Sequence, residues 1–370
     1  MRFLHLADLH LGWAPRNFER RKAVERAARR DGLLARAVDC ALKEKLDLVV
    51  IAGDLFETHR PSDELVGRAV TQLGRLLSAG VQVVTVPGNH DEITYADSVY
   101  NLWKGRWPGV LVTNALPAHV TTLRVGGEAV HLYSLAYTGG VTPAREPLKD
   151  FPHCGEPGFH LAVFHGTLGS GDARSLPLDR GALERAGYDY VALGHIHQRS
   201  ETPLGRTPVV YCGCAEGKGF DDPGVPHWAV GEVDGGRAKL SWLPCEVQCI
   251  AVETIDLTGI DSQEALEEAV ERFVDADMML RVRLTGSLHF PLDVGALERR
   301  FASRFYHFEV RDESTSIDES LLEAWAAQRT IQGVFVRRMR AHLDAATSED
   351  EKRQAVLALR YGLQALRAQA

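Results

Sequence analysis

The sequence predicts an α/β layered fold with a second sheet packed on the first, followed by a small α+β domain and C-terminal helices. Two observations lead to this prediction. Over about the first 245 residues, short runs of Val, Leu and Ile alternate with longer amphipathic stretches, which is the βαβα order of a layered fold. Around Pro244 this pattern gives way to a second, smaller arrangement of strands and helices.

The first strands are expected to be short and apolar because they are buried on both faces. Between them, Glu19–Lys45 and Ser62–Ala79 carry apolar residues at helical spacing. Five later runs are separated by turn residues, and they suggest antiparallel strands of a second sheet. The first strands are Arg2–Ala7, Leu46–Ile51, Val81–Val86, His160–Phe164 and Tyr190–Leu193; the later runs are Val120–Val125, Ala129–Leu135, Pro208–Cys212, Trp228–Val233 and Lys239–Leu243.

After Pro244 the sequence predicts a compact βαβαβ unit and then a helical segment. We therefore expect three parts, at residues 1–245, 246–313 and 314–370. The expected strands are Cys249–Leu257, Met278–Thr285 and Tyr306–Arg311, with helices at Ser262–Val274, Leu292–Ser303, Ile317–Gln328, Thr330–Leu343 and Ser348–Ala368.

The composition is that of an ordinary globular protein, with 45% hydrophobic and 25% charged residues and a formal net charge of -8. This balance argues against a surface that is basic all over, but nucleic-acid binding depends on where Lys and Arg lie. Six scattered cysteines without a CxxC pair favour free thiols in a reducing compartment, although Cys212 and Cys214 could be read as a metal or redox pair. No apolar run approaches the roughly 20 residues that span a bilayer. We therefore expect a cytoplasmic protein with no membrane partner.

Polar side chains follow five of the predicted strands at the point where each strand ends. In an open α/β sheet the carboxyl ends of the strands line one crevice, so residues that are far apart in the sequence converge there. Alternation along an extended segment points both members of an x-Leu-x or x-Ile-x pair to one side. The glycines that precede three of these residues let the chain turn sharply. The segments are Asp8-Leu-His10, Gly53-Asp54, Gly88-Asn89-His90-Asp91, His165-Gly166 and Gly194-His195-Ile-His197.

These segments predict a site for two divalent metal ions. Oxygen and imidazole ligands without thiolates suit Mn²⁺, Fe²⁺ or Zn²⁺. Seven ligands are too many for one ion with an open position and about right for two, with Asp54 as the natural bridge. Two ions roughly 3.5–4 Å apart can clamp the oxygens of a phosphate during an in-line displacement. The expected ligands are Asp8, His10, Asp54, Asn89, His165, His195 and His197.

Each segment taken alone has a structural alternative. An Asp-x-His or Gly-Asp pair is common, and a histidine at a strand end is more often a hydrogen-bonded structural group. The segment from Gly88 to Asp91 is more specific, because Asn89 is a poor core residue and lies beside two titratable groups. Five such segments in this order, each at a strand end, favour a metal-dependent phosphoesterase.

The same residues resemble the calcineurin-like metallophosphoesterases and, within them, the SbcD-type DNA repair exonucleases. The finer resemblance lies in Leu6-Ala-Asp-Leu-His-Leu11, Gly53-Asp-Leu-Phe56 and Val86-Pro-Gly-Asn-His-Asp91. This group includes the bacterial YhaO-like branch and the nuclease subunit of the eukaryotic and archaeal double-strand-break complex. The resemblance is specific over roughly residues 1–235 and looser beyond. It implies the four-layer metallophosphoesterase fold, in which two packed mixed sheets are flanked by helices. It also implies a capping domain over a DNA cleft and C-terminal helices that dock a partner ATPase.

Carried over residue by residue, the resemblance also implies roles. His90 would be the catalytic acid that protonates the leaving oxygen or stabilises the transition state, which suits an unperturbed pKa of about 6.5. Asp91 is left with two roles, either orienting His90 or holding a turn. The implied cofactors are two divalent ions, with Mn²⁺ preferred and Fe²⁺ or Zn²⁺ as alternatives. One ion would be held by Asp8, His10, Asp54 and His197, and the other by Asp54, Asn89, His165 and His195.

Two positions depart from the family pattern. Glu57 stands where family members often carry Asp, which puts any supporting role for the side chain there in doubt. The segment Tyr211-Cys-Gly-Cys214 replaces the more usual Tyr-Pro-Gly-Ser or Tyr-Pro-Gly-Asn. We expect Gly213 to keep the turn, while the contacts around it differ.

The predicted function is that of a metal-dependent DNA nuclease, an exonuclease with endonuclease action left open, in DNA repair or end processing. A protein phosphatase of this superfamily would carry Gly-Asp-x-x-Asp-Arg-Gly and Gly-Asn-His-Glu, whereas this chain has Gly53-Asp-Leu-Phe-Glu-Thr58, ends the second motif at Asp91, and places Arg60 too far along. A cyclic-nucleotide phosphodiesterase would seldom need the segment after Pro244. A DNA-binding scaffold subunit of an ATPase complex is the alternative from another class.

The expected partners are DNA, an SbcC-like coiled-coil ATPase and a second copy of the chain. For DNA, Arg299, Arg300 and Arg304 are interleaved with aromatic residues; this is either a phosphate-binding patch or a solvated helix face over an aromatic core. A helix with Arg337, Arg338 and Arg340 is expected to pack on its neighbours or a partner. For the homodimer the candidate is Tyr95–Trp103, with Tyr100, Leu102 and Trp103.

Overall fold

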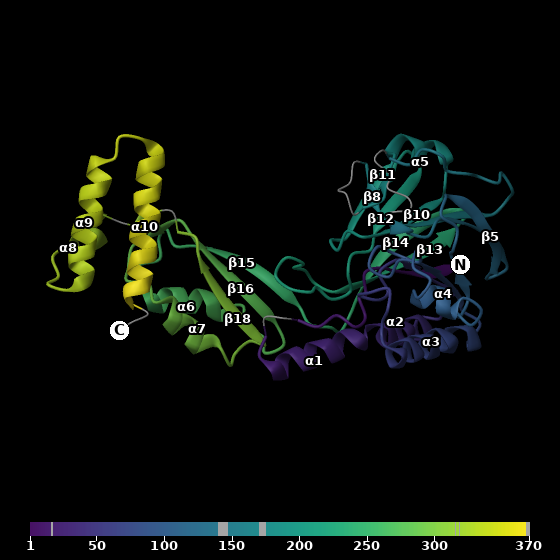
Figure 1. Cartoon of the computed structure of the whole chain (residues 1–370), viewed down its shortest axis with the longest axis horizontal. Helices are drawn as coiled ribbons and strands as arrows, with labels where there is room; N and C mark the ends of the chain where they lie inside the picture. The colour runs from purple at the N-terminus through teal and green to yellow at the C-terminus, as the bar shows by residue number, and fades with distance from the viewer. Residues whose placement is uncertain (16–17, 140–146, 170–174, 315, 318, 368–370) are drawn as a thin grey trace. The chain divides into compact units, whose positions relative to one another are not determined.

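The computed structural model describes the chain except residues 16–17, 140–146, 170–174, 315, 318 and 368–370. It divides into two compact units, Met1–Val247 and Gln248–Ala370, which are described separately (Figure 1). The predicted α/β class with two mixed sheets is confirmed. Within the described ranges, no helix has the length and apolar character needed to cross a membrane. All six cysteines are free thiols.

The first sheet of the N-terminal unit has the strand order β14-β13-β1-β2-β3-β4. Strands β1 to β4 are parallel, and β13 and β14 extend the sheet as antiparallel neighbours. Strand β2 is buried along its whole length, as expected for a central strand covered on both faces. The strands are β1 (Arg2–Leu6), β2 (Leu48–Ala52), β3 (Gln82–Val86), β4 (Val110–Leu111), β13 (His227–Asp234) and β14 (Arg237–Pro244).

The second sheet has the order β11-β12-β10-β7-β6-β5 and packs on the first through β7 and β10. The prediction that the later strands are antiparallel is wrong in part: β6 is parallel to β7, β12 is parallel to β10, and β13 and β14 join the first sheet. The turn residues between the runs mark chain reversals, and these do not decide which strand becomes the neighbour. The strands are β5 (Ala118–Val125), β6 (Glu128–Ser134), β7 (Phe159–His165), β10 (Tyr190–Gly194), β11 (Ser200–Leu204) and β12 (Thr207–Tyr211); β8 (Thr167–Leu168) and β9 (Pro177–Leu178) form a separate pair.

The amphipathic stretch Glu19–Lys45 forms two helices rather than one, because the chain leaves the first helix at Gly32. The second and third helices contact each other and bury their apolar faces in the core. The third begins at Ser62, whose Oγ accepts a hydrogen bond from the Leu65 amide at 3.3 Å. The helices of this unit are α1 (Arg20–Asp31), α2 (Leu33–Lys43), α3 (Asp63–Ser78), α4 (Val99–Trp103) and α5 (Arg180–Ala186).

A polar contact joins the two sheets inside the core. The ring of Phe3 meets that of Tyr190 edge-on at 5.0 Å, and buried His5 lies between the Tyr190 hydroxyl and the Leu193 carbonyl, each at 3.2 Å. Burial lowers the pKa of His5 to about 3, because the carbonyl only partly offsets the lost hydration of a charged ring. The neutral imidazole therefore serves as a hydrogen-bonding spacer between the sheets.

The C-terminal unit contains the predicted βαβαβ arrangement, with a parallel sheet of order β15-β16-β18. The three C-terminal helices share one apolar core with this sheet, and the core includes Leu280, Phe301, Trp325 and Leu359. The division at residue 313 and the docking role of the last helices remain predictions. The elements are β15 (Ile250–Asp256), α6 (Gln263–Glu271), β16 (Met279–Thr285), β17 (Ser287–Leu288), α7 (Val294–Phe301), β18 (His307–Asp312), β19 (Ser316–Ile317), α8 (Glu319–Ala326), α9 (Ile331–Ala345) and α10 (Glu349–Arg367); Ala368, the last residue of the final predicted helix, lies outside the described residues.

Replacing His5 with Gln is expected to weaken the dependence of stability on acid. The folded-state pKa of His5, about 3, lies below the ordinary 6.5, so the unfolded chain binds the proton first as the pH falls. Between pH 7 and pH 5 this residue should cost the wild type about 2 kcal/mol that the variant does not lose. Urea unfolding of the metal-free proteins at both pH values measures the difference. An identical pH dependence in the two proteins would contradict the burial of a neutral His5.

Candidate metal centre

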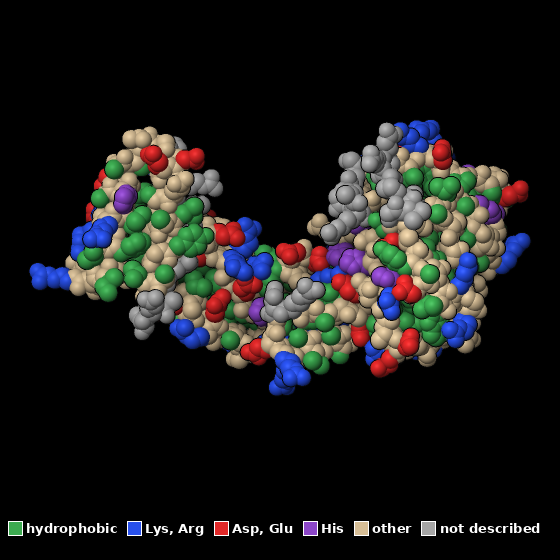
Figure 2. Space-filling model, viewed as in Figure 1, with side chains coloured by type: hydrophobic (Ala, Val, Ile, Leu, Met, Phe, Trp, Pro, Cys, Tyr) green, Lys and Arg blue, Asp and Glu red, His purple; other side chains and the backbone are tan. Residues whose placement is uncertain are grey.

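The loops that follow β1, β2, β3, β7 and β10 meet at one edge of the N-terminal unit. Two of them are joined by backbone hydrogen bonds, because the Asp8 amide donates to the Gly53 carbonyl at 3.1 Å and the His10 amide to the Asp54 carbonyl at 2.9 Å. The edge reaches solvent: the side chain of His90 is 39% exposed, and Figure 2 shows histidine side chains gathered beside acidic ones on the surface of this unit. The contacts below connect all seven predicted ligands at this edge: Asp8, His10, Asp54, Asn89, His165, His195 and His197.

Backbone strain is concentrated at this edge. In the described part of the chain, five residues other than glycine have a positive φ, and four of them are predicted ligands. Left-handed backbone is costly for such residues and persists where the surroundings enforce it, most often at functional sites. The four values of φ are 55° at Asp8, 49° at His10, 51° at Asp54 and 92° at His195.

The glycines before three of the predicted ligands provide space for other side chains. A Cβ at Gly53 would lie 2.2 Å from Nδ1 of His165, and a Cβ at Gly88 would lie 2.3 Å from Oδ1 of Asp54. At Gly194 it would lie 2.0 Å from the Ala52 carbonyl. Only Gly53 of the three has a positive φ, so close approach of the ligands explains the other two better than a sharp turn does.

A first group of ligand atoms is formed by Asp8, His10 and His197. The Nε2 atoms of the two imidazoles face each other at 3.1 Å. Asp8 and His10 are fully buried, and both oxygens of Asp8 accept from the His195 amide at 3.1 Å. Two imidazole nitrogens this close to each other and to a carboxylate form an arrangement that a shared cation stabilises.

A second group is formed by His165, Asn89 and His195. Oδ1 of Asn89 lies 2.8 Å from Nε2 of His165 and 2.9 Å from Nδ1 of His195. The contact between Nδ1 of His165 and the Ala52 carbonyl, at 2.8 Å, assigns the Nδ1 proton to that bond. Nε2 is then the nitrogen that faces the group and would bind a metal, as in histidines that bind metals.

The Asp54 carboxylate lies between the two groups. Its Oδ1 accepts from the His90 amide at 2.8 Å, while its Oδ2 lies 3.4 Å from Nε2 of His165 and 3.7 Å from Nε2 of His10. Burial alone would raise the pKa of Asp54, but His165 and His10 lower it well below the usual range, so Asp54 stays ionised. Burial likewise disfavours a charged His165, yet the Asp54 carboxylate raises the pKa of that ring to about 9. The donor set therefore fits two divalent cations that share one carboxylate.

His90 and Asp91, the two titratable residues that follow Asn89, make different contacts. His90 has its Nδ1 3.1 Å from the Glu57 carbonyl, which fixes the ring and leaves Nε2 directed away from that bond. Asp91 does not orient His90: its oxygens accept from the Gly88 and Phe56 amides and from the Tyr100 hydroxyl, at 2.7, 3.1 and 2.7 Å. Burial raises the pKa of Asp91 to about 6, with Asp54 adding to the effect. Of its two predicted roles, the contacts favour the turn.

A family model described as calcineurin-like phosphoesterase matches residues 1–199. The chain belongs to the calcineurin-like phosphoesterase family. Enzymes of this family are hydrolases that use divalent metal ions, and all of the predicted ligands lie within the matched residues.

This phosphoesterase is similar in sequence to three relatives from bacteria and archaea. It is 23% identical over 297 residues to the "Uncharacterized metallophosphoesterase YhaO" of Bacillus subtilis, covering 77% of this chain and 69% of the relative. It is 30% identical over 230 residues to the "DNA double-strand break repair protein Mre11" of Methanopyrus kandleri, covering 58% and 49%. The protein of the same name from Aeropyrum pernix is 30% identical over 234 residues, covering 57% and 52%. The chain thus spans about half the length of these Mre11 relatives.

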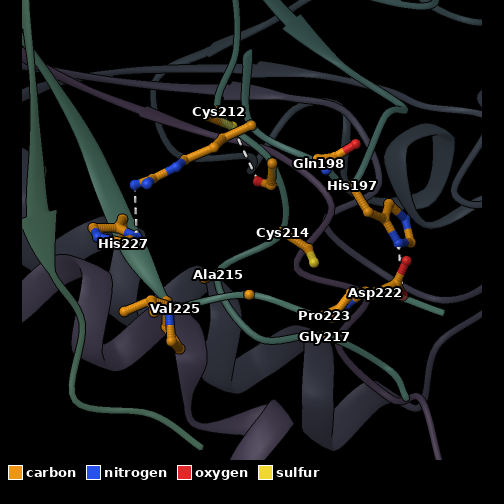
Figure 3. Close-up of a pocket in the computed structure, with 14 residues that line it drawn as sticks. His197, Gln198, Cys212, Cys214, Ala215, Gly217, Asp222, Pro223, Val225 and His227 are labelled. Atoms are coloured by element: carbon orange, nitrogen blue, oxygen red, sulfur yellow. Dashed lines mark hydrogen bonds and ion pairs between the residues drawn. The ribbon is translucent and has the colours of Figure 1, made fainter. Parts of the chain in front are cut away.

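Two carboxylates hold the imidazoles of the first group: Glu57, whose supporting role the sequence left in doubt, and Asp222, which sequence reasoning missed. Oε2 of Glu57 lies 2.9 Å from Nδ1 of His10, and Oδ2 of Asp222 lies 3.0 Å from Nδ1 of His197 (Figure 3). Lys218 links them, since its Nζ contacts Glu57 at 2.7 Å and its amide donates to Asp222 at 3.3 Å. Burial would raise the pKa of Glu57, but His10 and Lys218 lower it to about 2. Each carboxylate turns the Nε2 of its histidine toward the centre of the site.

A buried arginine of α1 holds two loops of the phosphoesterase together. Arg30 is fully buried, donating to the Leu9 carbonyl at 3.3 Å and to the carbonyls of Glu216 and Gly217 at 2.9 Å each. Leu9 lies between two predicted ligands, and the Glu216–Gly217 loop leads to Asp222. The Arg30 guanidinium also lies 5.0 Å from the centre of the Trp13 ring. Because α1 reads as an ordinary polar helix, only the three-dimensional structure identifies this role.

Removing the carboxylate of Asp222 is expected to weaken cation binding at the first group. The Asp222→Ala variant should bind Mn²⁺ about 10–100-fold less tightly, as is usual when the partner of a metal-binding histidine is lost. Asp221→Ala, at the exposed neighbouring position, is the matched control and should bind like the wild type. Titration of the metal-free proteins with Mn²⁺ gives both affinities. Equal affinities for Asp222→Ala and the control would rule out this positioning role.

Arg30→Met is expected to destabilise the protein by about 3–5 kcal/mol, because the buried Glu216 would lose a compensating positive charge nearby. Arg29→Met, on the same helix, removes a partly exposed pair with Glu25 and should cost less than about 1 kcal/mol. Denaturant unfolding of the two variants and the wild type gives the comparison. Similar losses in both variants would show that Arg30 has no special role.

Proposed function

We propose that this phosphoesterase is a DNA nuclease that hydrolyses phosphodiester bonds with two divalent cations, Mn²⁺ preferred, in DNA repair or end processing. The observation that carries the proposal is the Asp54 carboxylate with one ligand group on each side, 3.4 Å from His165 and 3.7 Å from His10. The substrate is suggested by relatives named for DNA double-strand break repair, which align with more than half of the chain.

The proposed mechanism assigns a task to each part of the edge. When bound, the two cations supply a water of lowered pKa and positive charge beside the phosphate. Asp54 holds the two ligand groups in register, and its own position is held by the His90 amide. His90, anchored by its Nδ1 on the Glu57 carbonyl, presents Nε2 to give a proton to the leaving oxygen. In line with this, His90 is more exposed than the ligands around it.

The protein phosphatase alternative receives no support from Arg60, the arginine that follows the Gly53–Thr58 motif. The side chain of Arg60 is exposed and forms an ion pair with Asp97 at 3.1 Å, so it is engaged away from the ligand groups. The cleavage of a small nucleotide is the alternative that the experiment below separates from the cleavage of DNA. The other alternative is a DNA-binding subunit with a mainly scaffolding role, which the same experiment tests.

The basic patch proposed for DNA is weaker in the structure than in the sequence. The aromatic residues of this patch, Phe301, Phe305 and Tyr306, are buried in the C-terminal unit. Arg300 pairs with Glu267 at 3.2 Å and Arg304 with Glu271 at 2.5 Å, which neutralises two of the three arginines. The helix α9 arginines behave similarly, since Arg337 donates to the Ala326 carbonyl and Arg340 pairs with Glu319. DNA contacts are therefore proposed near the metal centre rather than at these helices.

The remaining partners stay predictions. In the dimer candidate Tyr95–Trp103, Tyr100 is fully buried and donates to Asp91, so it is a core residue, whereas Leu102 is 61% exposed. Any homodimer contact through this segment would therefore rest on Leu102 and its exposed neighbours. An SbcC-like coiled-coil ATPase as partner of α8 to α10 rests on the resemblance alone.

Loss of the His90 side chain is expected to reduce DNA cleavage while leaving cation binding in place. The His90→Ala variant should lower kcat by about 10²–10⁴-fold on end-labelled linear duplex with Mn²⁺, because a general acid contributes that much. Single-stranded DNA, a cyclic nucleotide and a phosphopeptide are assayed beside it. Cleavage of the phosphopeptide but not of DNA would reject the proposal, and DNA binding without metal-dependent cleavage would favour the scaffold.

Two further variants make this result interpretable. Asp54→Ala should abolish both cleavage and the binding of two Mn²⁺ ions, which separates loss of the centre from loss of the acid. His342→Ala, at an exposed position of the C-terminal unit, is the matched control and should cleave like the wild type. If His90→Ala also lost its Mn²⁺, the residue would be a ligand and not the acid.

A further inference from the structure

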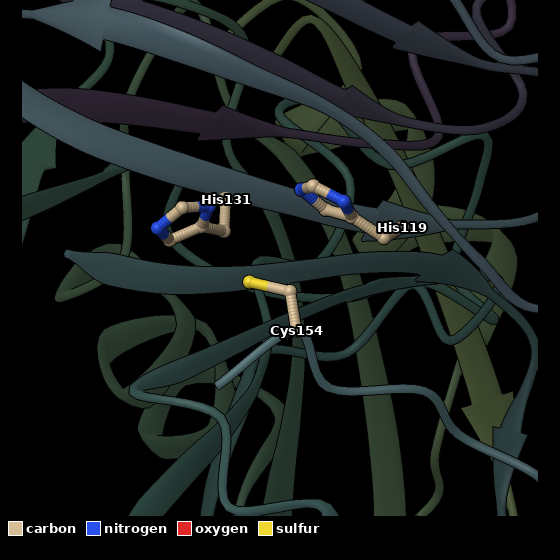
Figure 4. Close-up of side chains that lie close together, drawn as sticks. All are labelled: His119, His131 and Cys154. Atoms are coloured by element: carbon tan, nitrogen blue, oxygen red, sulfur yellow. The ribbon is translucent and has the colours of Figure 1, made fainter. Parts of the chain in front are cut away.

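A second cluster of ligand-type side chains lies on the β5–β6 hairpin. It joins His119 of β5, His131 of β6 and Cys154 of the segment that precedes β7 (Figure 4). One ligand atom from each residue lies within 4.8 Å of the other two. The cluster is separate from the centre described above: His131 pairs in register with His160 near the start of β7, whereas His165 ends that strand.

The orientation of His131 suits a metal ligand. The side chain is 4% exposed, and its Nε2 lies 3.1 Å from the Pro157 carbonyl, which assigns the proton to Nε2. Nδ1 then carries the lone pair and is directed at Thr122, whose Oγ1 lies 2.9 Å away. A backbone carbonyl that fixes one nitrogen and directs the other is the usual support of a metal-binding histidine.

Thr122 holds the two imidazoles in convergence. Its Oγ1 lies 2.9 Å from Nδ1 of His131 and 3.1 Å from Nε2 of His119. The ring centroids of the two histidines are 5.6 Å apart. The exposed ring of His119 can turn by rotation about its side-chain bonds, so cation binding needs no change in the strands.

Cys154 is held in place by a buried tyrosine. The hydroxyl of Tyr133 lies 3.1 Å from Sγ of Cys154 and 3.1 Å from the amide of the same residue. Tyr133 is fully buried, and its hydroxyl also lies 2.9 Å from Nδ1 of His160. A hydroxyl beside the sulfur can donate to a thiolate, which stabilises the form that binds metals.

We propose that His119, His131 and Cys154 form a mononuclear site for a thiophilic cation, with Zn²⁺ as the occupant and water at the fourth position. Bonds of about 2.0–2.3 Å to two imidazoles and one thiolate require the ligand atoms to close by about 1 Å. Binding converts the Cys154 thiol to a thiolate and releases one proton to solvent. The thiolate separates this site from the metal centre at the strand ends, whose oxygen and imidazole ligands suit Mn²⁺. Occupation fastens the Cys154 segment to the hairpin.

Cobalt is the probe for the thiolate ligand, because Co²⁺ bound to sulfur gives a charge-transfer band in the near ultraviolet. Metal-free full-length protein is titrated with Co²⁺ and the band is recorded for wild type, Cys154→Ser and Cys214→Ser. Cys214 is the matched control because its thiol lies beside His197 at the other centre. The band is expected in the wild type and in Cys214→Ser, and it is expected to be absent in Cys154→Ser. A wild type without the band, or a band lost only in Cys214→Ser, would overturn the proposal.

Zinc affinity tests the histidines without relying on activity. In a background of Asp8→Asn and Asp54→Asn, which disables the other centre, one zinc ion should still bind and raise the Tm. His119→Ala removes an exposed ligand without disturbing the core and should weaken zinc binding at least about tenfold. Unchanged zinc affinity in His119→Ala would contradict the assignment. Because neither readout is cleavage, failure of this site and failure of the nuclease proposal are distinguishable.

Discussion

The geometry of the candidate metal centre depends on one buried carboxylate. Asp54 is ionised, 2% exposed and in left-handed backbone, and Gly88 leaves room for its carboxylate because it lacks a Cβ. An isolated charge in such a position would cost several kcal/mol, so it is stable only when cationic or hydrogen-bonding groups surround it. The His90 amide satisfies one oxygen, and the other faces His10 and His165. The convergence of the strand ends on Asp54 is therefore an electrostatic requirement as well as a topological one.

The two ligand groups draw on both sheets, so the packing between the sheets sets the distance between the two groups. Asp8, His10 and Asp54 follow strands of the first sheet, whereas His165 ends and His195 follows a strand of the second. The contacts that fix this packing are made by Phe3, His5 and Tyr190, which lie in strands β1 and β10 a few residues before predicted ligands. A packed interior transmits small displacements. A change in the packing of the core would therefore also shift the predicted ligands.

The parts of this arrangement that the sequence predicted are those with local patterns. Buried strands are continuous apolar runs, and a ligand at the end of such a run, as at Asp54 or His165, is visible without knowing its neighbours. The supporting contacts are not visible in this way, because Glu57, Asp222 and Arg30 act across the fold. Asp222 and Arg30 resemble ordinary surface residues in the sequence, and Glu57 stands out only as a departure from the family's usual Asp. The prediction of which strands are neighbours was wrong in part for a similar reason. Turn residues show that the chain reverses, but they do not show beside which strand it returns.

The thiol next to the candidate metal centre has surroundings that keep it protonated. Cys214 forms a cluster with His197 and Asp222, so a thiolate there would compete for the cation (Figure 3). Burial raises the pKa of Cys214 to about 12, with the charge of Asp222 adding to the effect. A protonated thiol is a poor ligand, so Asp222 both orients His197 and helps to keep the neighbouring sulfur neutral. At Cys154, by contrast, the sulfur faces a tyrosine hydroxyl and two imidazoles rather than a carboxylate. The two cysteines thus differ in the groups beside the sulfur, and both burial and the Asp222 carboxylate disfavour a thiolate at Cys214.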